Sequence, residues 1–265
     1  MLYRIKKNFK ILKMSFIYNI LKEMENRGSF LSQIIFMTIN NIFFIVQWFV
    51  FFGFKKIIVG YNFNDILMLW ALVSASCGIA HLFFENVFYI PEIITTGKLD
   101  AYITQPLNVL WNVSISKTNP SALGDLINGF ILAFFAVGIN LYKILLFLLF
   151  LILGGISIAS FSALCGSLVF WFKRGEGIPH NLYFSIVMAG TYPEGVFNGF
   201  VKFLFYTVIP VGFMLYMPLK TICSLKLTYF ATVLLFDVLL VILTFFVFNN
   251  GLRRYSSSNL INNRV

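Results

Sequence analysis

The chain has 265 residues, of which 59% are hydrophobic and only 11% are charged, and its mean hydropathy is +0.86. Ordinary soluble domains carry about 25% charged residues, so the composition excludes a soluble protein and predicts an all-α polytopic membrane protein. The formal net charge of +10 does not indicate a nucleic-acid partner, because the basic residues stand beside apolar runs, where membrane topology explains them.

Residues 1–28 contain seven of the twenty Lys and Arg residues. Apolar residues recur there at steps of three and four: Ile5, Phe9, Leu12, Phe16, Ile20 and Met24. This spacing predicts a basic amphipathic helix that lies in the cytosolic membrane interface. A disordered basic tail is the alternative, although such regular spacing is uncommon in disordered segments.

A transmembrane domain with six spans is expected over residues 29–249. The apolar runs predict four spans at 30–54, 65–90, 122–139 and 144–172, and a last span at 227–248. Because only residues 140–143 separate the third span from the fourth, these two are expected to form a tight helical hairpin.

Two interpretations of residues 175–224 remain open. Either 197–217 is the fifth span, or 178–191 is a short fifth span and 196–218 is a re-entrant segment on the outer side. Pro210 and Pro218 interrupt the later stretch. Backbone broken at membrane depth needs cover from protein rather than lipid, which slightly favours the second interpretation.

The distribution of basic residues predicts the orientation. With the N-terminus inside, the cytosolic segments carry fourteen Lys and Arg residues and the outer loops carry five. This bias places both termini in the cytosol, together with residues 91–120 and the tail at 250–265.

Residues 91–120, which we call the coupling segment, form the most polar long interval between the apolar runs. Apolar side chains at Leu99, Tyr102, Ile103, Leu107 and Leu110 recur at helical spacing. The pattern predicts a short cytosolic helix between spans two and three, with one polar and one apolar face. Such a helix needs a surface to dock against, so we expect the segment to contact a cytosolic partner.

Four ionisable residues fall within predicted spans. His81 and Glu85 are four residues apart on one helix face, where a hydrogen-bonded pair is the simplest interpretation and a place on a substrate path or gate is the alternative. Asp125 lies near the start of the third span, where we expect it to reach water or to cap the helix. Asp237 is near the middle of the last span, where we expect it to face a polar partner on another helix, with contact to cargo as the alternative.

The sequence does not favour an enzyme. It contains only two histidines and has no His-Glu-x-x-His, Gly-x-Ser-x-Gly or P-loop pattern. We therefore expect no catalytic residue, no metal site and no cofactor in this chain. If ATP drives the protein, a second polypeptide must bind it.

Two groups of residues resemble those of a known family. The run from Gly97 to Asn108 resembles the Gly-x-Leu-Asp-x-x-Leu-x-x-Pro-x-Asn segment of bacterial ABC exporter permeases of the type-two class, with Ile103 in place of the usual leucine. The Tyr192-Pro193 pair, the Ile209-Pro210 pair and Pro218 are similar to later elements of that family, in the expected order. The likeness covers essentially the whole chain.

The resemblance implies a six-helix permease subunit in the bacterial cytoplasmic membrane. Such a subunit pairs with a second permease, identical or homologous, and with a dimer of cytosolic ABC ATPases that bind ATP and Mg. The loop between spans two and three then carries a coupling helix. On this chain the residues that match it are Gly97, Lys98, Leu99, Asp100, Tyr102, Gln105 and Pro106.

The expected activity is export of a hydrophobic or amphipathic substrate by alternating access, as in multidrug or antibiotic efflux, within surrounding membrane lipid. The alternative is a scaffold, immunity or sensor protein with the same fold and no transport.

Overall fold

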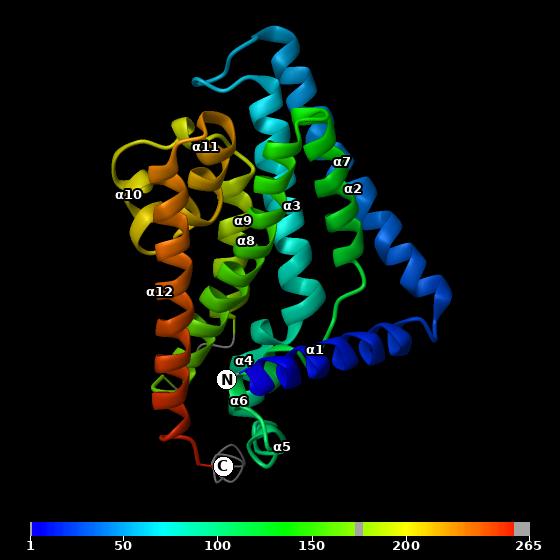
Figure 1. Ribbon diagram of the computed structural model, residues 1–265, viewed down its shortest axis with the longest axis vertical. Helices are drawn as coiled ribbons and strands as arrows, with labels where there is room; N and C mark the ends of the chain where they lie inside the picture. The colour runs from blue at the N-terminus through cyan, green and yellow to red at the C-terminus, as the bar shows by residue number, and fades with distance from the viewer. Residues whose placement is uncertain (1, 173–176, 257–265) are drawn as a thin grey trace.

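The computed structural model describes residues 2–172 and 177–256, and these residues are almost entirely helical (Figure 1). Within these two ranges, the only strand-like pairing is an isolated bridge between Ile58 and Tyr61. Helices α3, α7, α8 and α12 run roughly along the long axis of the molecule, and α2 slants away from them beside α7 (Figure 1). A further helix, α1, lies across one end of the bundle (Figure 1). The predicted all-α class is confirmed.

The N-terminal helix α1 spans Leu2–Glu23, as the apolar spacing predicts. It packs against the bundle through an aromatic contact between Phe16 and Phe83, whose ring centroids are 5.0 Å apart. The Ser15 hydroxyl also donates a 2.5 Å hydrogen bond to the carbonyl oxygen of Ile115. These contacts join α1 to the end of α3 and to the coupling segment. Its position at the membrane surface stays a prediction.

Four helical stretches of the described residues are long and apolar enough to cross a membrane. They are α2 (Arg27–Phe54), the stretch Phe63–Thr95 that begins with α3 (Phe63–Phe84), the stretch Leu141–Phe170 that begins with α8 (Leu141–Ser167), and α12 (Leu227–Leu252). A multi-pass membrane protein is therefore confirmed, but the count of six spans is not. The predicted third span is helix α7 (Ala122–Val137), whose 16 residues fall short of the roughly 20 that span a bilayer.

Helix α3 is the centre of the bundle, since all its residues from Ile66 to Gly78 are buried and it packs chiefly against α7 and α8. Small residues allow this close approach. A Cβ atom added at Gly129 of α7 would lie 2.7 Å from the Ala75 side chain of α3, and one added at Gly155 of α8 would overlap the Ile79 side chain. Close packing of small residues replaces the hydrophobic effect as the force between helices in a membrane.

Helices α7 and α8 form the predicted hairpin. Gly138 ends α7 with a φ of +58°, a left-handed conformation that favours glycine. Asn140 then caps α8, because its side-chain oxygen accepts a 3.1 Å hydrogen bond from the Lys143 amide. The turn and the cap explain why three residues, 138–140, suffice between the two helices.

The stretch after α8 is broken into short pieces. Helix α9 spans Ile178–Gly190, and a 3₁₀ turn η3 (Glu194–Val196) leads into α10 (Gly199–Thr207). A π-helical turn η4 (Gly212–Tyr216) precedes α11 (Met217–Ser224). Residues 199–207 and 212–224 meet at a bend of 80°, at the position of Pro210, which cannot donate a helical hydrogen bond. Residues 197–217 are therefore not one straight helix.

The buried carboxylate of Glu194 joins these pieces. It forms ion pairs with Lys202 of α10, at 3.1 Å, and with Lys220 of α11, and it accepts a 2.8 Å hydrogen bond from the Tyr206 hydroxyl. Burial alone would raise the pKa of Glu194. The hydrogen bonds from Lys220 and Tyr206 and the charge of Lys220 outweigh burial and leave the pKa below its ordinary value.

We expect Glu194→Gln to lower the free energy of unfolding by about 1–3 kcal/mol at neutral pH, since it removes a carboxylate bonded to charged partners. A depressed carboxyl pKa stabilises the fold above the unfolded-state value of 4.5, and the gain is lost as the pH falls below it. The deficit of the variant should therefore shrink in acid. Thermal unfolding in detergent at neutral and acidic pH measures both effects, and a deficit that does not change with pH would contradict this role of Glu194.

Candidate functional site

The coupling segment folds into three short helices, not the single helix that the spacing predicts. They are α4 (Ile90–Thr95), α5 (Asp100–Ile103) and α6 (Val109–Ser114). Gly97 separates α4 from α5 with a φ of +75°. Pro106 lies between α5 and α6, and proline disfavours helical conformation at the residue before it. These two residues break the predicted helix.

The break changes which residues of the segment are buried. Leu99 and Leu110 are buried, with 1% and 3% exposure, as the amphipathic pattern predicts. Ile103 was expected on the same apolar face, but 41% of its surface is exposed. Helix α5 ends at Ile103, so the predicted apolar face does not continue beyond this residue.

Hydrogen bonds fix the base of α5 to the end of α3. The Tyr102 hydroxyl lies 3.3 Å from the Asn86 side-chain nitrogen and 3.1 Å from the Ser116 hydroxyl. Asn86 donates a further 2.7 Å bond to Ser116. Asn86 belongs to the 3₁₀ turn η1 (Glu85–Tyr89), which continues directly from α3. The three side chains therefore tie the coupling segment to the central helix of the bundle.

Other predicted residues hold the segment together. Gln105 donates a 3.0 Å bond to the carbonyl oxygen of Ala101 and accepts a 2.8 Å bond from Asn112 of α6. Lys98 forms an exposed ion pair with Glu92 at 2.8 Å. Asp100 lies near Tyr255, which follows α12; burial, and then the Asp100 carboxylate, raise the pKa of Tyr255 to about 12.

The tip of the segment is exposed and protrudes. Helix α5 lies at the extreme end of the molecule, beyond α1 (Figure 1). The exposed residues of the tip are Ala101, Ile103, Thr104, Gln105 and Pro106. The structure thus presents a small, mostly uncharged surface on a base held by hydrogen bonds.

His81 and Glu85 form the hydrogen-bonded pair that their spacing predicts. The His81 Nδ1 atom lies 2.5 Å from Glu85 Oε2, and Glu85 is 4% exposed. The His81 ring stacks on Phe88 at 4.5 Å and meets the edge of Tyr183 of α9 at 4.7 Å. The pair lies where α3 gives way to η1, and Glu85 directly precedes Asn86. These contacts give it a packing role between α3 and α9.

Asp125 does not reach water or cap α7, so that expectation is wrong. It is 5% exposed and accepts a 2.8 Å hydrogen bond from the buried Asn41 side chain of α2. The Ser74 hydroxyl of α3 also donates a 2.7 Å bond to the Asp125 backbone oxygen. Asp125 therefore joins α2 and α3 through α7, since the start of α7 is buried against both.

We expect Asp125→Ala to lower the free energy of unfolding by about 1–3 kcal/mol, because the buried Asn41 amide loses its acceptor. Asp125→Asn retains an acceptor oxygen and should cost clearly less. Thermal unfolding of the two variants in the same detergent compares them. Equal losses would show that the hydrogen bond to Asn41 contributes little.

Asp237 lies elsewhere in the bundle. It is 5% exposed and accepts a hydrogen bond from the Ser157 hydroxyl of α8, which is the kind of contact its position predicts. Within the described part of the chain, no hydrogen bond or ion pair joins it to Asp125 or to the His81–Glu85 pair. The four ionisable residues therefore do not form one site.

Sequence reasoning missed the uncharged partners, chiefly Asn41, Asn86, Asn112 and Ser116. Each lies in or beside an apolar helical run, where an amide or hydroxyl needs a buried partner. That was the available signal, but it does not say which distant residue is the partner.

Comparison with known proteins identifies the family of this chain. Residues 35–259 match the sequence model of a family described as ABC-2 family transporter protein. No curated protein and no solved structure matches the chain. The match covers the coupling segment and most of the helical bundle. The chain belongs to the ABC-2 transporter family and is a membrane permease component of an ABC transporter.

Proposed function

We propose that this chain is an exporter permease whose α5 tip receives the motion of a cytosolic ABC ATPase. The observation that carries the proposal is an exposed tip on a base bonded to the central helix. The Ile103 side chain is exposed at the tip, whereas Leu99 and Tyr102 anchor the base. A docking surface needs both features, since a contact on a loose loop would move without moving the bundle.

The path from the tip to the bundle is short. Tyr102 bonds Asn86, and Asn86 belongs to the turn that continues α3. A displacement of α5 is thereby transmitted to the helix that packs against both α7 and α8. ATP and Mg bind to the partner, and this chain contributes no nucleotide site. Coupling requires that the ATPase contact the segment differently in its two states.

The same proposal includes the assembly and its orientation. Two permeases and two ATPase subunits form the transporter, with both termini of this chain in the cytosol. The basic residues of 1–28 and of the coupling segment support this orientation. Short α9 serves as the fifth span and the bent pair of α10 and α11 as an outer re-entrant segment, which the 80° bend supports. Exported substrates are hydrophobic or amphipathic, including drugs and antibiotics.

Affinity purification of this chain from its native membrane in mild detergent tests the proposal. We expect a P-loop ATPase and a second permease to co-purify, with ATPase activity in the eluate. Variants of Gly97 and Asp100 should lose the ATPase but retain the second permease. Recovery of the chain alone in several detergents would contradict transport and would favour a scaffold, immunity or sensor protein.

A further inference from the structure

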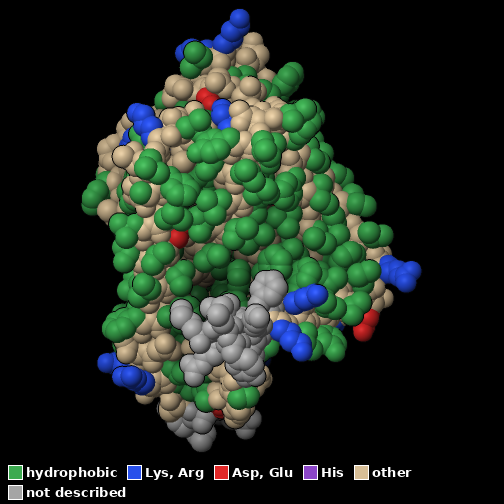
Figure 2. All heavy atoms as spheres, viewed as in Figure 1, with side chains coloured by type: hydrophobic (Ala, Val, Ile, Leu, Met, Phe, Trp, Pro, Cys, Tyr) green, Lys and Arg blue, Asp and Glu red, His purple; other side chains and the backbone are tan. Residues whose placement is uncertain are grey.

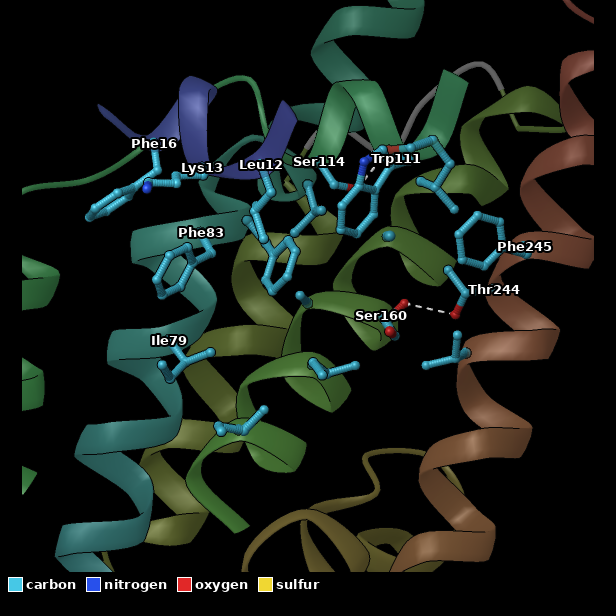
Figure 3. Close-up of a pocket in the computed structure, with 18 residues that line it drawn as sticks. Leu12, Lys13, Phe16, Ile79, Phe83, Trp111, Ser114, Ser160, Thr244 and Phe245 are labelled. Carbon is cyan, nitrogen blue, oxygen red and sulfur yellow. Dashed lines mark hydrogen bonds between the residues drawn. The ribbon is translucent and has the colours of Figure 1, made fainter. Parts of the chain in front are cut away.

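A large apolar cavity lies between α3, α8 and α12, beside α1 and α6. Its volume is about 710 Å³, within the range of roughly 300–1,000 Å³ that is usual for small-molecule sites. Figure 2 shows a hollow in the apolar face of the molecule at this position, and Figure 3 shows the side chains that line it. The lining includes Leu12, Ile79, Phe83, Ile156, Val241 and Phe245.

The Thr244 hydroxyl, in the middle of the cavity, is already bonded within the protein. The Thr244 hydroxyl lies 3.0 Å from the Ser160 carbonyl oxygen and 2.8 Å from that of Leu240 (Figure 3). The cavity therefore offers no free hydroxyl of Thr244 to a polar solute. A chamber lined in this way holds hydrocarbon more favourably than water.

The end of the cavity beside α1 and α6 is less apolar than the middle, because it includes a charged side chain. Lys13 of α1 lines it and is exposed. Trp111 of α6 also lines it, and its buried indole Nε1–H finds no hydrogen-bond acceptor among the described residues. The charge of Lys13 thus stands at one end of an apolar cavity, whereas the Trp111 N–H is itself buried in the protein.

The helices that surround the cavity indicate which kind of molecule can enter it. Helices α3, α8 and α12 belong to three of the stretches that are apolar and long enough to cross the membrane. Lipid is therefore the medium around them, and an acyl chain needs no path through water. The amphiphilic lining matches an amphiphile whose head carries negative charge and acceptor oxygens.

We propose that the cavity binds one anionic phospholipid. One acyl chain lies between α3, α8 and α12, and the phosphate meets Lys13 at the end of the cavity beside α1. The bound lipid supports α1, which holds the rest of the molecule through few polar bonds such as that of Ser15 to Ile115. Lipid binding at this site requires no ATPase, so its test does not depend on the proposed transport function.

Photolabelling in nanodiscs tests the site. The probe is phosphatidylglycerol with a diazirine in its acyl chain, in a background of phosphatidylcholine, and mass spectrometry maps the labelled peptides. We expect label on residues 152–163 and 241–245, and Ile156→Trp, which fills the cavity, should abolish it. Leu239→Trp is the matched control, because Leu239 is 55% exposed on the outer face of α12.

A second pair of variants tests the headgroup contact without disturbing the core. Lys13→Gln should weaken labelling by the anionic probe about fivefold, the factor expected for one lysine near a membrane surface. Lys10→Gln, also exposed on α1 but outside the cavity lining, should have a smaller effect. Equal labelling by a phosphatidylcholine probe, or equal labelling of the Lys13 and Lys10 variants, would overturn the proposal. So would crosslinking to a second copy of the chain by a photoreactive amino acid placed at position 156.

Discussion

Replacement of Ile103 by aspartate should reduce recovery of the ATPase with this chain at least about tenfold, while the bundle stays folded. Ile103 is the large apolar side chain exposed on α5. Burial of an isoleucine in an interface contributes about 1.5–3 kcal/mol, and a charge in its place adds a cost of desolvation. Since the side chain is 41% exposed in the free chain, its loss should leave the stability of the chain nearly unchanged.

Ile57→Asp is the matched control for this experiment. Ile57 is 61% exposed and lies in the α2–α3 connection, at the end of the bundle away from α5 (Figure 1). The control should co-purify with the ATPase as the wild type does. If both variants retain the ATPase, the α5 tip is not the docking surface. If Ile103→Asp also lowers the unfolding temperature, the residue is structural.

Gly129→Leu should prevent α7 from packing on α3 and cause the largest loss of stability among these substitutions. A Cβ atom at this position would lie 2.7 Å from the Ala75 side chain, 2.9 Å from the Ala75 amide nitrogen and 3.0 Å from the Ala71 carbonyl oxygen. Two of these atoms are backbone and cannot rotate away. Overpacking of a core costs about 1–3 kcal/mol even where side chains can move, so we expect a loss above that range. Fluorescence-detected size-exclusion chromatography should show little monodisperse protein.

Gly53→Leu separates this effect from the change in helix propensity. Gly53 lies in the last turn of α2, and nothing lies within 4 Å of an added Cβ atom. Leucine is a better helix former than glycine by several tenths of a kcal/mol, so this variant should be as stable as the wild type or more so. Comparable loss at positions 53 and 129 would mean that contact with α3 is not the cause.

The long helices could be predicted closely from the sequence. The predicted spans 30–54 and 227–248 differ by only a few residues from α2 and α12, because apolar runs of this length have one stable conformation in a membrane. The span count could not be fixed in the same way. The 16 residues of α7 and the bend near Pro210 depend on cover from neighbouring helices, which a single sequence does not specify.

In the coupling segment, prediction from the sequence failed for a different reason. Its burial at Leu99 and Leu110 followed from the apolar spacing, but a periodic pattern does not reveal a left-handed residue such as Gly97. The partner of Asp125 was also beyond prediction, since Asn41 is 84 residues away in the chain. Contacts at such separation depend on the packing of whole helices, not on local spacing.

Under the proposed coupling function, we expect the central stretch Phe63–Thr95 to act as a lever arm. Its 33 residues correspond to about 50 Å of helix, so a tilt of about 5° moves its far end by about 4 Å. Contacts at Gly129 of α7 and Gly155 of α8 hold these helices close against it. If α5 receives the motion of an ATPase, as proposed, we expect the three helices to move together, so that a displacement at the α5 end also reaches the opposite membrane surface.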